Sequence, residues 1–147
     1  MKKLTSIILA AACLCGCEGF LDIFNGNGTD EAEERASAYT VDEARSHTGE
    51  SDVWIRGYIV GGDLTSAKIS FTPPFKSRTN LAIAPFPECM QRDSCLSVQL
   101  PSGAIRDSLN LADRPGMLGR EVWLKGKIVS SYYGIPGLQN VCRYHME

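Results

Sequence analysis

The sequence lacks the residues and motifs that many enzymes need. It has two histidines, His47 and His145, and neither stands beside a serine or cysteine in a nucleophile motif. There is no phosphate-binding glycine loop and no H-E-x-x-H motif. We therefore expect a protein that is not an enzyme and that needs no metal or cofactor.

A hydrophobic run long enough to span a bilayer is also missing. The run from Leu4 to Leu14 is too short for that and follows two lysines, so it predicts an export signal. It ends in Leu14-Cys15-Gly16-Cys17, which resembles the lipobox of bacterial lipoproteins. The resemblance implies that residues 1–16 are a signal peptide and that Cys17 is lipidated, with Cys13 as the alternative. We expect an outer-membrane lipoprotein of the cell envelope, on either its periplasmic or its surface face.

The chain has little excess of positive charge. From Thr40 onward it carries twelve Lys and Arg against eleven Asp and Glu, which argues against avid DNA binding. Residues 17–39 hold six acids and one base, Arg35, and we interpret them as an unfolded acidic tether. The remaining residues, 40–147, have the length of one domain.

Three cysteines remain in that domain: Cys89, Cys95 and Cys142. Because thiols oxidise outside the cytoplasm, we expect one disulfide. The sequence favours the short loop from Cys89 to Cys95, while a bridge from Cys95 to Cys142 stays open. A zinc site on Cys142-x-x-His145 lacks the paired C-x-x-C knuckles of zinc-binding modules.

The octets VWIRGYIV (53–60) and VWLKGKIV (122–129) alternate between apolar and polar residues, as half-buried strands do. Further strands are expected over 80–84, 95–100 and 138–145, a helix after Pro101-Ser102-Gly103, and a short helix capped by Thr40. Gly57 and Gly126 would let the two long strands bend. Five strands with a helix between the third and fourth predict an OB-like β-barrel. The alternative, an immunoglobulin-like sandwich, needs about seven strands.

The run from Tyr39 to Tyr144 resembles a domain of unknown function found in lipoproteins of Gram-negative gut anaerobes. The matching pieces are Tyr39-Thr40-Val41, Gly57-Tyr58-Ile59-Val60-Gly61, Phe71-Thr72-Pro73-Pro74-Phe75, Thr79-Asn80-Leu81-Ala82-Ile83-Ala84, Val98-Gln99-Leu100-Pro101-Ser102-Gly103, Leu109-Asn110-Leu111 and Tyr132-Tyr133-Gly134-Ile135-Pro136-Gly137-Leu138. The resemblance implies an OB-like fold, nucleic-acid binding by analogy with other OB-folds, and an occasional association with nuclease domains. It carries over no catalytic residue.

OB-folds bind ligands on a sheet face between two loops, here residues 61–68 and 130–137. The second loop holds Tyr132 and Tyr133, which could stack on a base or a sugar ring. The alternative is that these rings pack against the end of the barrel.

A second candidate surface is the outward side of the octets. Trp54, Arg56 and Tyr58 alternate outward on the first octet, and Trp123, Lys125 and Lys127 do so on the second. Antiparallel pairing is expected to place Arg56 near Lys127 and Tyr58 near Lys125. Such a patch suits an anionic ligand, or it is a solvated face whose cations lie over the tryptophans.

Together these features predict a membrane-anchored binding module for single-stranded nucleic acid or an oligosaccharide. The alternative is a protein-interaction or structural subunit of an envelope complex, with another envelope protein as its partner.

Overall fold

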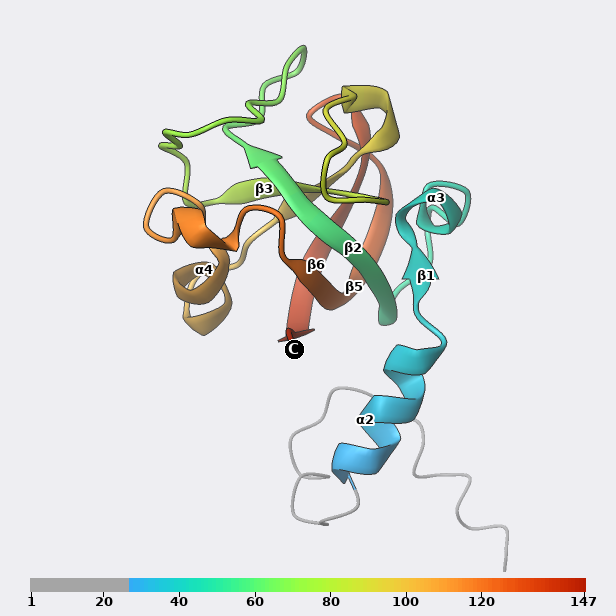
Figure 1. Cartoon of the computed structure of the whole chain (residues 1–147). Helices are drawn as coiled ribbons and strands as arrows, with labels where there is room; N and C mark the ends of the chain where they lie inside the picture. Colours follow the sequence, from blue (N-terminus) through green and yellow to red (C-terminus); the bar gives the residue numbers. More distant parts are fainter. Residues whose placement is uncertain (1–26) are drawn as a thin grey trace, which may run out of the picture.

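A computed structural model describes residues 27–147, which form a mainly β structure with one six-stranded mixed sheet and few helices (Figure 1). The strands are β1 (Tyr39–Thr40), β2 (Val53–Gly62), β3 (Asn80–Ala84), β4 (Leu96–Gln99), β5 (Glu121–Tyr132) and β6 (Ile135–His145). The helices are α2 (Asn27–Ala36), α3 (Val41–Ala44) and α4 (Ala104–Leu109), with 3₁₀ turns η2 (Arg92–Ser94) and η3 (Pro115–Met117). Over residues 27–147, no helix has the length and apolar character that crossing a membrane requires.

The strands pair in the order β1-β2-β3-β4-β6-β5, and β2 also pairs with β5. The β1–β2 and β4–β6 pairs are parallel and the others are antiparallel. All five strands expected from the sequence are therefore present, and α4 lies between the third and fourth of them as expected. The helix ends at Leu109, where the Asn110 side chain donates to the Arg106 carbonyl oxygen and accepts from the Asp113 N–H.

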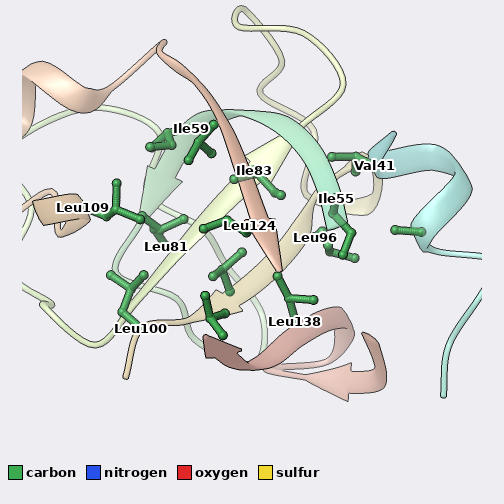
Figure 2. Close-up of a cluster of buried hydrophobic side chains, with 14 of the residues drawn as sticks. Val41, Ile55, Ile59, Leu81, Ile83, Leu96, Leu100, Leu109, Leu124 and Leu138 are labelled. Carbon is green, nitrogen blue, oxygen red and sulfur yellow. The ribbon is translucent and has the colours of Figure 1, made fainter. Parts of the chain in front are cut away.

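The main hydrophobic core lies on one side of the strands (Figure 2). Alternate residues supply it, among them Ile55 and Ile59 of β2 and Leu81 and Ile83 of β3. Val41 joins them from α3, whose expected capping box is present: Glu43 N–H donates to Thr40 Oγ1, and Thr40 N–H donates to Glu43 Oε1. Burying these side chains is the main favourable term in folding.

A second hydrophobic cluster covers the opposite side of β2 and β3. Ala82 and Ala84 alternate with the core residues of β3 and point into this cluster, so β3 is buried on both sides. We call this side the loop-covered face; its members are Val60, Leu64, Ile69, Ala82, Ala84, Cys89, Cys95 and Ile135. Most of the covering side chains come from the long connections between β2 and β3 and between β3 and β4.

The structure holds Cys89 and Cys95 as two thiols, not as the expected disulfide. Both are buried and both donate toward the Gln91 carbonyl oxygen, with Sγ–O distances of 3.9 and 3.3 Å. Burial, and then the neighbouring Cys89, raise the pKa of Cys95 to about 12. Cys142 is exposed and lies on β6, in a different part of the molecule.

The acidic segment differs from its expected form. Residues 27–36 form helix α2 instead of unfolded chain, because charged side chains of this helix find partners on the sheet. The rest of the predicted tether, the predicted signal peptide and Cys17 lie outside the described residues.

Candidate anion-binding surface

The two octets lie side by side, but in a different register from the expected one. Trp54 is opposite Lys125, Arg56 is opposite Trp123, and Tyr58 is opposite Glu121. The expected pairs, Arg56 with Lys127 and Tyr58 with Lys125, are therefore wrong by four residues along β5. Because four is an even number, the same side chains still face outward.

Trp54 and Lys125 form the centre of this outer side. Each is almost fully buried, at 5% and 6% exposure, although neither belongs to the main core. The Trp54 indole Nε1–H donates to Glu34 Oε1 at 3.1 Å, and Lys125 Nζ lies 3.5 Å from the same oxygen. One carboxylate oxygen of α2 thus serves two donors on neighbouring strands.

Arg143 of β6 extends the surface to a third strand. It lies opposite Lys125 in the β5–β6 pair, and its Nη1 donates to Glu31 Oε2 at 2.5 Å. We call Trp54, Lys125 and Arg143 the anion-binding surface. An indole N–H, an ammonium and a guanidinium stand in a row across β2, β5 and β6, and all are hydrogen-bond donors.

Helix α2 presents one face to this surface. Glu31, Glu34 and Arg35 are three or four residues apart, so they share a side of the helix. The Arg35 guanidinium carbon lies 5.7 Å from the centre of the Trp54 ring, and Arg35 also pairs with Glu31 at 3.9 Å. Glu33 is exposed.

The margins of the surface carry the remaining cations and the second tryptophan. Arg56 pairs with Glu121 at 3.4 Å, so its charge already has a partner. Lys127 is exposed. Trp123 packs edge to face against His145, with ring centres 5.6 Å apart. A hollow of about 530 Å³ lies next to this histidine, and its lining residues are Ser108, Arg114, Met117, Arg120, Tyr144, His145 and Met146.

The two loop tyrosines belong to a different region. Tyr132 lies seven residues beyond Lys125 along β5, roughly 20 Å in an extended strand. The Tyr132 and Tyr133 ring centres are 4.7 Å apart, and the Tyr133 hydroxyl lies 3.4 Å from Asn80 Nδ2. Burial and the neighbouring Tyr133 raise the pKa of Tyr132. Tyr133 is 37% exposed, so packing against the barrel end and stacking on a ligand both stay predictions.

The two loops that were expected to flank a ligand surface are tied together by Arg92. Strand β5 ends at Tyr132 and β6 begins at Ile135. The expected loop 130–137 is therefore reduced to a tight turn, with Tyr133 and Gly134 at φ 58° and 85°. Arg92 Nη2 ties this turn to the first loop by donating to the carbonyl oxygens of Tyr133 and Ser66 at 2.7 and 2.8 Å. Tyr58 packs against the loop-covered face, away from Lys125.

Sequence reasoning missed three members of the assembled site. Arg143 stands on an expected strand, and pairing that strand with the second octet would have pointed to it. Glu31 and Glu34 were visible only as part of an acidic run. Their spacing of three residues, with Arg35 next in line, is the helical signal that the run contained.

Within residues 27–147, no group of three or more His, Cys, Asp or Glu side chains is placed to hold a metal ion. Trp54, Lys125 and Arg143 supply hydrogen-bond donors and positive charge, which bind and orient an anion.

Comparison with known proteins gives one named relative and one family. The chain is 27% identical over 141 residues to Endonuclease YhcR of Bacillus subtilis (strain 168), a match that covers 96% of this chain and 11% of that protein. No solved structure matches. A family model described as "Domain of unknown function (DUF6359)" matches residues 39–147, so the chain belongs to that family.

Proposed function

We propose that this protein is a lipid-anchored, non-enzymatic binding module with an OB-like barrel, and that its anion-binding surface takes single-stranded nucleic acid. The barrel interpretation is supported by the strand pairing, which runs β2-β3-β4-β6-β5 and returns to β2. The position of α4 between β4 and β5 also fits that topology.

One observation carries the proposed ligand class: the surface already binds two carboxylates. Glu34 bonds Trp54 and pairs with Lys125, and Glu31 bonds Arg143. The same donors match the oxygens of a phosphodiester, which also carries one negative charge per unit. Trp54 and Trp123 supply rings on which bases can stack.

A nucleic-acid ligand explains this arrangement better than a neutral sugar does. A neutral oligosaccharide offers no charge to Lys125 and Arg143, and desolvating an unpaired charge is costly. The similarity to part of a protein named as an endonuclease is in line with a role near nucleic acid. Cutting activity is not part of the proposal, since the match covers 11% of that protein.

The test is a tryptophan-fluorescence titration of the full chain with single-stranded DNA and RNA oligonucleotides at two salt concentrations. We expect saturable binding with an association constant that falls as salt rises. The slope of its logarithm against the logarithm of salt concentration should be negative and no steeper than about −1.4, the value for two cationic contacts. The double variant Lys125→Met/Arg143→Met should bind at least about tenfold more weakly. The matched control is Lys68→Met/Lys76→Met, which removes two exposed lysines of the β2–β3 connection and should bind as the wild type does.

Two results would overturn the nucleic-acid proposal. Salt-independent binding of a neutral oligosaccharide, without nucleic-acid binding, would make the protein a glycan module. Binding of neither would favour the alternative of a protein partner in the envelope.

The anchor has its own test. Labelling cells with a fatty-acid analogue should tag the wild-type chain and not the Cys17→Ser variant. Equal labelling of both would contradict acylation at Cys17.

A further inference from the structure

Helix α2 stands where the proposed ligand would bind. We propose that α2 is an internal competitor, an acidic helix that must leave the anion-binding surface before single-stranded nucleic acid can occupy it. This inference rests on the proposed function, because it concerns the regulation of the same surface.

The competition follows from the donors that α2 uses. The Trp54 N–H is a single donor, and it is bonded to Glu34. The Lys125 side chain is 7% exposed with Glu34 in place, so a phosphate cannot reach the ammonium without moving that carboxylate. Arg143 Nη1 is bonded to Glu31 in the same way.

The attachment of α2 is ionic and contains little apolar packing. From Glu31 to Ala36 no side chain of the helix is buried. The four-residue helix α3, in contrast, buries Val41 and Ala44 in the main core. A ten-residue helix is also marginal in water by itself, so once detached α2 would lose its helical structure. An element held in this way can be released by a competing polyanion or by salt.

The family model covers the sheet domain and leaves α2 out. The matched residues begin at Tyr39, three residues after α2 ends at Ala36. The residues that the family model matches thus contain the anion-binding surface and not the helix that covers it, whereas the alignment with Endonuclease YhcR covers 96% of the chain and includes residues 27–36.

The size of the effect follows from population shift. If only the form with α2 detached binds, the apparent affinity is reduced by the fraction of molecules in that form. Weakening the attachment should therefore tighten binding, by about three- to tenfold if α2 is attached in most molecules.

The first experiment compares Glu34→Ala with Glu33→Ala in the full chain. Both variants remove one negative charge from neighbouring positions of α2, but only Glu34 contacts the anion-binding surface. We expect Glu34→Ala to bind a single-stranded oligonucleotide about three- to tenfold more tightly than Glu33→Ala, which should stay within about twofold of wild type. Equal affinities of the two variants, with binding intact, would overturn the competition and leave the proposed function standing.

The second experiment follows α2 directly by amide hydrogen exchange. Saturating oligonucleotide should speed exchange over residues 27–36, because the released helix unfolds. Unchanged or slower exchange there, with the surface occupied, would show that ligand and helix bind together, and the inference would be wrong. If no variant binds any oligonucleotide, the proposed function and this inference both fail.

Discussion

Two outer surfaces of the same sheet are covered in opposite ways. The loop-covered face is sealed by apolar side chains such as Leu64, Ile69 and Ile135. The anion-binding surface is covered by α2 through carboxylates, with no buried side chain on the helix from residue 31 onward. Apolar burial is not weakened by charge screening or by competing anions, whereas an ionic cover is weakened by both. The first cover is therefore part of the fold, and the second can be exchanged for a ligand.

The largest expected effect is on the apolar cover. Leu64 is 6% exposed within the second cluster, and Leu64→Ala should lower the free energy of unfolding by about 2–4 kcal/mol. Phe86→Ala is the control, since Phe86 is 50% exposed and should cost less than about 0.5 kcal/mol. Urea unfolding followed by circular dichroism measures both. Similar losses for the two variants would mean that the loops do not seal this face.

A second test of the same face uses pH. The raised pKa of Cys95 means that the folded state keeps its thiol proton after the unfolded state has lost it near the ordinary value of 9.0. The free energy of unfolding should therefore fall as pH rises from 9.0 toward about 12, and Cys95→Ala should remove this part of the fall. Parallel pH profiles for wild type and variant would contradict the burial of this thiol.

The ionic cover should contribute much less to stability. Glu34→Ala is expected to lower the free energy of unfolding by less than about 1 kcal/mol, because α2 can detach and let water reach Lys125. A loss of about 3 kcal/mol or more is typical of a fixed buried ion pair that loses one partner. That result would make α2 a permanent part of the fold and would remove the contrast between the two surfaces.

The smallest expected effect is on the quenching of tryptophan fluorescence. The variant Trp123→Phe leaves Trp54 as the single tryptophan, which is 5% exposed beneath α2. Its quenching by acrylamide should rise, by about twofold, between low salt and about 0.5 M salt as the ionic cover loosens. The companion variant Trp54→Phe reports on Trp123, which packs against His145 and should not respond. A flat salt response of Trp54 would count against a loosely held helix.

Side-chain alternation was sufficient to predict which residues of the octets face outward. Trp54 and Lys125 do point away from the main core, and Ile55 and Leu124 point into it. The register between the octets was not predictable in the same way. It depends on where the connections and β6 hold the strands, and both octets accept any even shift without moving an apolar residue out of the core.

The role of the two octet glycines was also only partly predictable from the sequence. They were expected to permit bending, and the β5–β6 register does shift between Lys125 and Lys127, around Gly126. Glycine is also required at both positions because other atoms lie too close to leave room for a side chain. A Cβ on Gly126 would lie 2.7 Å from the Gln139 carbonyl oxygen, and one on Gly57 would lie 2.7 Å from Val41 Cγ2. These contacts join residues far apart in the sequence, so no local pattern could reveal them.

The site itself was only partly predictable for a physical reason. An acidic run in isolation has too little apolar surface to fold, and composition therefore predicted a tether. Helix α2 forms because its carboxylates meet Trp54, Lys125 and Arg143, three residues from three separate strands. The order of a segment can thus depend on partners that only the folded domain assembles.

Arg92 suggests how this scaffold could be altered. Its single guanidinium group holds Ser66 and Tyr133 together, and a Cβ on Gly134 would lie 2.7 Å from Arg92 Nη2. The connections that follow β2, β3 and β5 are therefore held together by the hydrogen bonds of one side chain, Arg92. Lengthening any one of them in an engineered protein would require redesigning the other two, whereas helix α2, which contacts Trp54, Lys125 and Arg143, could be exchanged without changing the Arg92 hydrogen bonds.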